Sequence, residues 1–468
     1  MGFTHFGCTN TPTRMTELVV GLPNKPLTLQ SWRIRDGVSS VIGNQIHRGL
    51  IRRDPETGQF LGAIAERWET NDNPAESRFF LKKNILFHNG KNLTCGDVKF
   101  SFERLVQKKI ETSIRFPKGT SFQCEDGHTF VIKLPFVPAQ LLDILASPAA
   151  AVSDKTGLVG LGPYRLTGEQ EDSIQLESVV DVGPKQLLFR IGTAEALERQ
   201  FSEGKVDDIL YLGHFTSPKV SCLEITGLSP TVFWFGLNAR NQPLNSETTR
   251  KQVKRLLELA LDSTSIFKEE QRSISLIPFG VPGHRSPASD SLEAEIRNLR
   301  GSIAKGLIKG KLRFGLRKIN QSDYRWSELF SAADPKREIF AFEFLDNNEF
   351  FESYYQHRLD LFYVGGNITR NDPFEVLSFF RSDDTVNPSG VTSDQVDQLA
   401  NQAASARTLA EVRDLATRAD AWVLDHAYAV PLFSKRFRGC VRHGLTGYRL
   451  SPLGQVSLDY SLIQGAQR

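Results

Sequence analysis

The chain has 468 residues, and its 57 Lys and Arg against 54 Asp and Glu leave a formal net charge of +3. This length allows about two or three domains with a large core. The balanced charge, without a polybasic tail or an acidic block, argues against nucleic acid or a membrane surface as the partner. The sequence contains no run of about eighteen apolar residues, which is the length that would predict a membrane-spanning helix.

The first predicted elements are a strand and a helix. Glu17–Gly21 is a short apolar run that predicts a strand, which Pro23 and Pro26 end. From Val38 the apolar residues recur mostly at three- and four-residue steps as far as Ile51, and this spacing predicts a helix.

A compact strand–strand–helix unit is predicted within Leu61–Val106. Trp68–Thr70 and Arg78–Lys82 indicate two strands, and Asn71–Pro74 between them consists of residues that favour turns. Asn89-Gly90 is the strongest short turn signal in the chain.

The helix of this unit has a clear start. Thr94 is predicted to be its N-cap, with Asp97 as the capping partner three residues later. Cys95, just inside the cap, is interpreted as a small structural residue that packs there. The apolar face expected for the helix consists of Val98, Phe102, Leu105 and Val106.

The remaining elements alternate between strands and helices, and Ser153–Gly162, loose and rich in Gly, suggests a crossing between domains. Strands are predicted at Thr129–Leu134, Gly162–Leu166, Leu188–Gly192, Val232–Asn238, Lys311–Leu316, Asp360–Gly366 and Ala429–Phe433. Helices are predicted at Ala139–Ala146, Ala194–Ser202 with Gly204 after its end, Thr248–Phe267, Ser291–Leu299, Asp394–Ala404, and Leu409–Asp425 with Thr408 and Glu411 as a capping box.

Part of this pattern resembles a known family. The run IAERW…FHNGKNLTCGDVKFSFERLV is similar to the signature of the peptide/nickel class (family 5) of solute-binding proteins, which are the extracytoplasmic receptors of ABC importers. Gly162–Leu166 resembles the "GPY" strand of that family, and Ala429–Phe433 resembles its "iPl" strand. The resemblance implies an α/β, two-lobed, periplasmic-binding-protein-like fold (class II, hinge-closing) with an extra inserted domain.

The resemblance also implies a domain division and a function. Domain I would consist of residues 1–40, 158–237 and 436–468, the inserted domain II of 41–157, and domain III of 238–435. The implied protein is an extracytoplasmic or periplasmic monomer without a cofactor. It would capture a peptide-like or other small solute between two lobes and deliver it to an ABC import permease.

The resemblance places ligand contacts in four segments: Asn24–Leu29, Phe233–Phe235, Gly365–Asp372 and Phe433–Arg436. For Trp234, an apolar cavity wall with a polar N–H and ordinary core packing are both open. Arg370 either favours an anionic group or faces solvent. The residues expected to contact a ligand are Asn24, Trp234, Gly365, Asn367, Thr369, Arg370 and Phe433.

The loop at Gly365 departs from the family pattern. Members that bind peptides read "GW..DYpDP" here, and the first Asp of that run pairs with the N-terminal ammonium of the peptide. In this chain Gly366 takes the place of the Trp and Thr369 that of the Asp. Because burying an ammonium without a carboxylate is costly, a free peptide amine is not the expected ligand; Asp372 is expected to cap the next segment.

The five cysteines are widely spaced and form no CxxC pair. His5–Cys8, followed by polar residues, resembles the tail of a bacterial lipoprotein signal, which implies a lipid on Cys8; a chance N-terminal Cys is the alternative. The other four fit free buried thiols or one or two disulfides, and spacing does not choose between these states. They are Cys95, Cys124, Cys222 and Cys440.

The sequence carries no motif for catalysis or metal binding. It contains no GxSxG, HExxH or P-loop, and we interpret His88 as an exposed residue beside a turn. The run Arg190–Gly213 (RIGTAEALERQFSEGKVDDILYLG) has the strand–helix–strand rhythm of a parallel sheet with a right-handed crossover. Asp207 and Asp208 are neighbours on its second strand, so they point to opposite faces and cannot share one acid–base site. We therefore expect no enzyme and no metal site, with a hydrolase as the least favoured reading. The alternative to transport is a ligand sensor or scaffold on the same fold.

Overall fold

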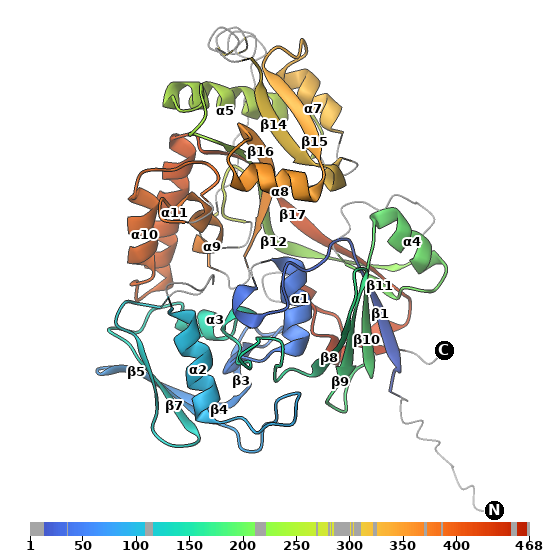
Figure 1. Cartoon of the computed structure of the whole chain (residues 1–468), viewed down its shortest axis with the longest axis vertical. Coiled ribbons are helices and arrows are strands. Elements are labelled where there is room, and N and C mark those ends of the chain that lie inside the picture. The colour runs from blue at the N-terminus through green and yellow to red at the C-terminus, as the bar shows by residue number, and fades with distance from the viewer. Residues whose placement is uncertain are drawn as a thin grey trace, which may run out of the picture.

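The computed structural model describes residues 14–34, 36–107, 116–210, 221–267, 270–278, 281, 283–284, 300, 303, 310–321, 325–368, 372–384, 387–450 and 456–465. These residues form two lobes, one above the other in Figure 1, which two long strands connect. One eleven-stranded sheet runs through both lobes in the order β15-β14-β16-β12-β17-β11-β1-β10-β9-β8, and β13 pairs with β17.

The first lobe occupies the lower right of Figure 1. Its central strand, β1, runs parallel to β10 on one side and to β11 on the other, and α4 connects these two neighbours. This is the parallel strand–helix–strand arrangement that the sequence predicts. The elements are β1 (Glu17–Leu22), α1 (Gly37–Ile46), β8 (Tyr164–Glu169), β9 (Ser173–Ser178), β10 (Gln186–Ile191), α4 (Ala194–Ser202) and β11 (Asp208–Ile209).

A separate four-stranded sheet, in the order β4-β5-β7-β6, lies at the lower left of Figure 1 with α2 against it. We call this part the insert. Rings of Phe79, Phe102, Phe122 and Phe130 fill the space between helix and sheet. Its elements are β4 (Ala65–Asp72), β5 (Ala75–Leu81), α2 (Cys95–Leu105), β6 (Ser121–Cys124), β7 (Thr129–Lys133) and α3 (Leu141–Leu145).

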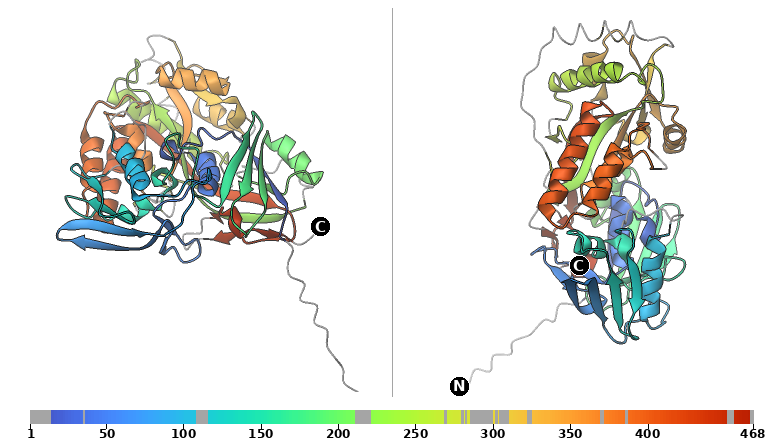
Figure 2. Two further views of the ribbon diagram at one scale, coloured as in Figure 1. Left: turned by 60° about the horizontal axis from the view of Figure 1, so that its bottom comes forward. Right: turned by 90° about the vertical axis from the view of Figure 1, so that its left-hand side faces the viewer.

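The second lobe forms the top of the molecule. Two buried clusters lie on the two faces of its sheet, one around Phe235 and Phe314 and the other around Trp234 and the helices α10 and α11. Figure 2 shows α10 and α11 side by side along the flank of the lobe. The elements are α5 (Glu247–Asp262), β14 (Leu312–Arg317), α7 (Trp326–Ala333), β15 (Phe340–Leu345), α8 (Asn347–Tyr355), β16 (Leu361–Asn367), α9 (Phe374–Leu377), α10 (Gln395–Ala403) and α11 (Leu409–Asp425).

The two lobes share the strands β12 (Leu223–Leu237) and β17 (Ala429–Val441), which we call the hinge strands. They pair antiparallel along most of their length and enter both lobes. Their register shifts between Leu228 and Val232 and again between Phe233 and Trp234.

The remaining elements are short. They are η1 (Ser31–Arg33), β2 (Ile51–Arg53), β3 (Phe60–Gly62), η2 (Pro148–Ala150), β13 (Gln271–Arg272), η3 (Lys318–Asn320), η4 (Ser378–Phe380), β18 (Leu445–Thr446), β19 (Arg449–Leu450), β20 (Val456–Ser457), η5 (Tyr460–Leu462) and β21 (Gln464–Gly465).

Several helix ends confirm the sequence predictions. Thr94 with Asp97, and Thr408 with Glu411, form complete capping boxes at the starts of α2 and α11. Gly204 follows α4 with a φ of 71°, the left-handed conformation that glycine adopts at low cost. Each of these signals depends only on chemistry within a few residues.

Other predictions need correction. The helix expected from Val38 to Ile51 ends at Ile46, because His47 is extended and its buried ring contacts the Leu29 carbonyl; Ile51 begins β2. Val106 is 46% exposed, because it ends α2 and does not join the apolar face. The predicted helix Ser291–Leu299 lies outside the described residues, as does Cys8.

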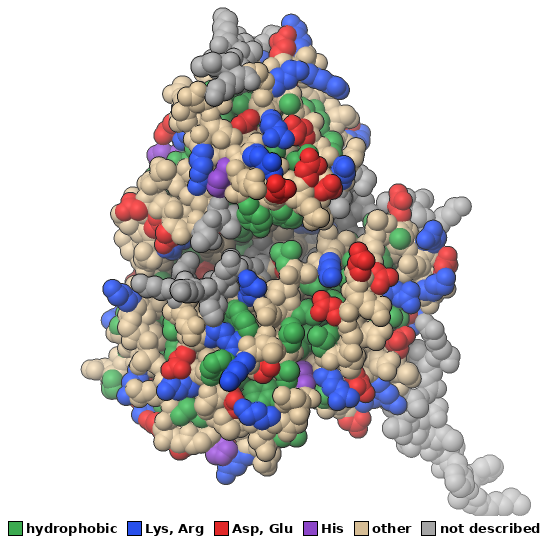
Figure 3. All heavy atoms as spheres, in the orientation of Figure 1, with side chains coloured by type: hydrophobic (Ala, Val, Ile, Leu, Met, Phe, Trp, Pro, Cys, Tyr) green, Lys and Arg blue, Asp and Glu red, His purple; other side chains and the backbone are tan. Residues whose placement is uncertain are grey.

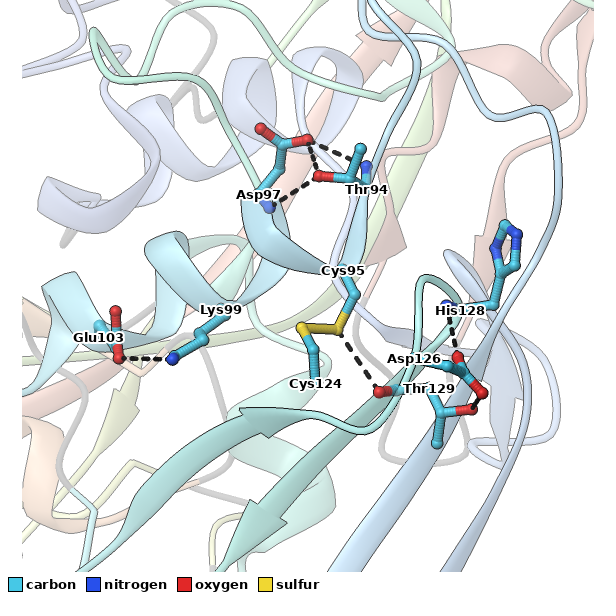
Figure 4. Close-up of a disulfide and its surroundings, with 9 residues drawn as sticks. All are labelled: Thr94, Cys95, Asp97, Lys99, Glu103, Cys124, Asp126, His128 and Thr129. Atoms are coloured by element: carbon cyan, nitrogen blue, oxygen red, sulfur yellow. Dashed lines mark hydrogen bonds and ion pairs between the residues drawn. A yellow bond between two sulfur atoms is a disulfide. The ribbon is translucent and has the colours of Figure 1, made fainter.

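Two disulfides decide the question that the spacing left open. Cys95 bonds to Cys124, and Cys222 bonds to Cys440. Cys95 is therefore more than a small packing residue: it fastens the start of α2 to β6, next to the Thr94–Asp97 cap (Figure 4). The second bond fastens the segment before β12 to β17, so it braces the hinge strands at their first-lobe end.

Three polar residues singled out in the sequence have defined surroundings. His88 is half-buried, and its Nε2 lies 3.0 Å from the Gly162 carbonyl oxygen, so the interpretation as an exposed residue is wrong. Asp207 accepts a hydrogen bond from the Val19 N–H and pairs with Arg442. Asp208 instead accepts hydrogen bonds from two tyrosines, so the two carboxylates serve different partners, as expected.

Candidate functional site

A cavity of about 920 Å³ lies between the lobes, and we call it the interlobe cavity. Its walls come from the loop after β1 and the start of α1, from the α3 region of the insert, from the hinge strands, and from the second lobe. In Figure 3 hydrophobic side chains gather on both sides of the hollow between the lobes. A cavity of this size is in the range of sites that enclose a small molecule.

The insert and the second lobe touch at one edge of this cavity. The Ala139 N–H donates a hydrogen bond of 2.9 Å to the Ala406 carbonyl, and Ala139 packs against the buried cluster around α10 and α11. The neighbouring residues Pro138 and Gln140 line the cavity itself. This contact closes the cavity on the side of α10.

The hinge strands form the wall where the lobes meet. Phe233 and Trp234 both line the cavity, although neighbours on a regular strand point to opposite faces. The register shift between them is the reason, because such an irregularity redirects side chains. Phe235 points instead into the second-lobe core, where its ring meets Phe314 edge-on.

Trp234 combines the two roles that the sequence left open. It lines the cavity and is also 1% exposed, with its ring tilted against Phe379 and Phe380. Gly366 lies directly beneath it: a Cβ on Gly366 would stand 3.0 Å from Trp234 Cζ3 and 2.9 Å from Val376 Cγ2. The indole therefore fills the space that a side chain at position 366 would need.

The end of β16 and the loop after it are only partly described. Gly365 and Gly366 line the cavity, and the ring of Phe233 packs so closely on Gly365 that a Cβ there would lie 2.7 Å from it. Asp372 also lines the cavity, and its carboxylate accepts a hydrogen bond of 3.0 Å from the Phe374 N–H at the start of α9. The predicted contacts Thr369 and Arg370, and the side chain of Asn367, lie outside the described residues.

Phe433 is placed differently from its prediction. It is fully buried in the second-lobe core and stacks on Phe233 with a centroid distance of 5.1 Å, so it stands behind the cavity wall and not in it. Two residues later on β17, Lys435 does line the cavity. Asn24 is exposed and lines the cavity from the first lobe, together with Lys25 and Leu27.

One wall went unrecognised in the sequence. Helix α8 turns Phe350, Phe351, Tyr354 and Tyr355 toward the cavity, and burial raises the pKa of the Tyr354 hydroxyl far above its ordinary value. Asp346 caps this helix by accepting a hydrogen bond of 2.9 Å from the Glu349 N–H. The Asp346 cap, followed by the aromatic run FFESYY, is the sequence feature from which this helix and its aromatic face could have been predicted.

The charged residues of the wall differ in how fully they are paired. Arg381 contacts both Asp383 and Asp397, at 2.8 Å and 3.3 Å, and its carboxylate partners raise the pKa of the guanidinium. Asp36 caps α1 through the Ser39 N–H, and burial raises the pKa of its carboxyl. Lys25 and Lys435 form no ion pair within the described part of the chain.

Two other kinds of feature are absent from the described ranges. No group of three or more His, Cys, Asp or Glu residues is placed there to hold a metal ion. Among the same residues, no helix combines the length and the apolar character needed to cross a membrane.

A family model and two curated relatives that match this chain are all of solute-binding or dipeptide-binding proteins. Residues 59–294 match the family model described as bacterial extracellular solute-binding proteins, family 5 Middle. The chain is 27% identical over 270 residues to the probable D,D-dipeptide-binding periplasmic protein DdpA of Escherichia coli (strain K12), a match covering 50% of this chain and 52% of that one, so it spans about half of that relative. It is 21% identical over 496 residues to the dipeptide-binding protein DppE of Bacillus subtilis (strain 168), covering 89% and 86%.

The fold matches solved structures over nearly its whole length. A dipeptide-binding protein from Pseudoalteromonas sp. SM9913, in complex with Met-Leu, superposes with a TM-score of 0.82 at 16% identity, covering 96% of this chain and 100% of that one. At such low identity the likeness concerns the fold.

Proposed function

This chain belongs to the bacterial extracellular solute-binding proteins of family 5, and on that premise we propose that it captures a small solute in the interlobe cavity and delivers it to an ABC import permease. The observation that carries the proposal is the cavity itself. About 920 Å³ of space lies between two lobes that, among the described residues, are joined by the hinge strands and by the edge contact between Ala139 and Ala406. Lobes joined in this way can close on a ligand by rotation about the hinge.

The described residues support capture more than chemistry. The family consists of solute-binding proteins, and the cavity wall combines aromatic rings, small residues and a few charged groups, as ligand-binding sites do. We expect the protein to act as a monomer, and we keep the division into 1–40 with 158–237 and 436–468, 41–157, and 238–435 as our domain proposal; its boundary after residue 40 lies within α1, whose apolar side chains pack in the first-lobe core.

The expected location is outside the cytoplasm, as the family description states. The two disulfides agree with this location, because such bonds persist in oxidising compartments. A lipid anchor on Cys8 belongs to the same proposal, and the mass of the N-terminal peptide of protein made in its native host would test it.

A thermal-shift screen of the purified protein tests capture. Pools of peptides, sugars and metal chelates are added separately, and at least one pool is expected to raise the melting temperature, because a ligand that binds only the folded state stabilises it. If no pool raises it, capture of these solutes is refuted.

A matched pair of variants shows whether a stabilising pool acts in the cavity. Ala404 lines the cavity after α10, whereas the neighbouring Ser405 is exposed and outside it. Ala404→Trp should reduce or abolish the shift, and Ser405→Trp should retain it. Equal shifts in the two variants would place binding elsewhere.

A further inference from the structure

We propose that the captured solute carries an anionic group, which Lys435 binds where the hinge strands lose their register, and an apolar part that packs on α8. This inference rests on the proposed function, since it describes the occupant of the interlobe cavity. Three independent observations carry it: the position of Lys435, the pairing of the charges in the wall, and the exposed apolar side chains on both sides of the cavity.

Lys435 stands at a break in the strand ladder. Leu228 pairs with Arg436 and Val232 pairs with Ser434, so Lys435 alone faces the three residues 229–231 of the other strand. We call Ser229–Thr231 the hinge bulge. Its two hydroxyls lie 2.9 Å apart and, like Lys435, line the cavity. The Ser229 hydroxyl donates its hydrogen to the Thr231 hydroxyl, so the Lys435 ammonium is the charged donor that this wall offers an anion.

The charged side chains that line the cavity favour an anionic solute over a cationic one, because two lysines among them form no ion pair within the described residues. The Lys435 ammonium lies 5.9 Å from the centre of the Phe233 ring and pairs with no carboxylate among the described residues. Lys25, on the first-lobe side, is likewise without an ion pair there. A lysine in a partly enclosed cavity gains most from a counter-ion, because attraction between charges is stronger there than in water.

Each of the four carboxylates of the same wall, Asp36, Asp372, Glu375 and Asp384, already has at least one partner. Asp372 accepts from the Phe374 N–H, and one oxygen of Asp36 accepts from the Ser39 N–H. The other Asp36 oxygen is buried and has no hydrogen-bond partner among the described residues. A solute cation would compete with the Phe374 N–H for Asp372 and would reach Asp36 only at this one buried oxygen, whereas an anion meets an ammonium that forms no ion pair within the described part of the chain.

Apolar side chains face the cavity from both lobes. Leu27, on the loop after β1, is 76% exposed, and Tyr355, at the end of α8, is 55% exposed; both line the cavity. The rings of Phe351 and Tyr355 stack at a centroid distance of 6.0 Å. Water-exposed apolar groups on two sides of one cavity gain from an apolar body between them. The solute class is therefore amphipathic, with a carboxylate or another small anion as its charged end.

A fractionated natural mixture tests this inference. Yeast extract is divided on an anion-exchange resin into an unbound fraction and a retained fraction that is eluted and desalted. Each fraction, and the whole extract, is added to the purified protein in a thermal-shift assay. The retained fraction should raise the melting temperature and the unbound fraction should not. An unbound fraction that stabilises as strongly refutes the anionic solute and leaves capture intact; if the whole extract and both fractions fail, the proposed function fails in this assay as well.

Variants then assign the anion to its residue. Lys435→Gln should weaken binding of the retained fraction about ten-fold or more, the usual loss when a charge-assisted hydrogen bond is removed. Lys435→Arg should keep most of the binding. Lys311→Gln, at an exposed lysine outside the cavity, should bind as the unaltered protein does. If folded Lys435→Gln protein binds the retained fraction as strongly as the unaltered protein does, the role of Lys435 is refuted. If that variant does not fold, Lys435→Met takes its place as the test of Lys435, and the comparison of fractions on the unaltered protein still tests the anionic solute.

Discussion

Replacing Asp208 by Asn is expected to remove a marked pH dependence from the stability of this chain. Asp208 is fully buried in β11, and one of its oxygens accepts hydrogen bonds from the Tyr448 hydroxyl at 2.6 Å and the Tyr460 hydroxyl at 3.4 Å. Its other oxygen, Oδ1, has no hydrogen-bond partner within the part of the chain that the structure describes. Burial raises the pKa of this carboxyl from 3.8 to about 7; the two tyrosines act in the opposite direction, and Asp207 adds to the rise.

The sign of the effect follows from proton binding. In the folded chain Asp208 keeps its proton up to about pH 7, whereas in the unfolded chain it releases the proton near pH 4. Between these values the folded state binds more protons, so the free energy of unfolding falls as the pH rises. One proton corresponds to about 1.4 kcal/mol per pH unit, so the loss from about pH 4 to pH 7 is roughly 4 kcal/mol.

Urea unfolding at a series of pH values measures this contribution. The difference in free energy of unfolding between the unaltered protein and Asp208→Asn should change by about 1.4 kcal/mol per pH unit in this window and become flat above it. Asp181→Asn, at a fully exposed carboxylate, is the control and should follow the unaltered protein. Parallel curves for Asp208→Asn and the unaltered protein would refute a raised pKa at this residue.

Two further predictions concern packing and the disulfides. Gly366→Ala should lower the free energy of unfolding by about 1–3 kcal/mol, because the added methyl group overlaps its neighbours. Gly127→Ala, where a Cβ meets nothing within 4 Å, is the control, and equal losses in the two variants would contradict the packing described. In denaturant unfolding, Cys222→Ser should lower the free energy of unfolding more than Cys95→Ser does, because the bonds span 218 and 29 residues. Loop entropy gives losses of about 5 and about 3.6 kcal/mol, and the reverse order would show that loop length does not govern the stability that these bonds provide.

The sequence predicted those features that neighbouring residues determine. Thr94 and Thr408 are caps because their side chains reach N–H groups three residues away, and Gly204 ends α4 because it adopts positive φ easily. His88 was misread for the opposite reason. Its partner, the Gly162 carbonyl, is distant in sequence, and nothing near His88 indicates the contact.

The candidate site was predictable only in part. Family resemblance led to Asn24, Trp234 and Gly365, which do line the cavity. It also led to Phe433, which is buried behind the cavity wall. On β17 the residue that lines the cavity is Lys435, two positions later and opposite the hinge bulge, and the alternation of side chains along a strand does not reveal this difference. The fit of the Trp234 indole over Gly366 depends on two strands that pair only after folding, so neither residue alone predicts it.

The order of strands in the large sheet has a consequence for how the protein is made. β17 comes near the end of the chain, yet it pairs with both β11 and β12, which are synthesised some two hundred residues earlier. Until β17 emerges, the edges of β11 and β12 that it will cover stay open, and such edges are templates for wrong pairing. Neither lobe can thus reach its final form on a growing chain, and a fragment that stops before Ala429 should aggregate and not fold.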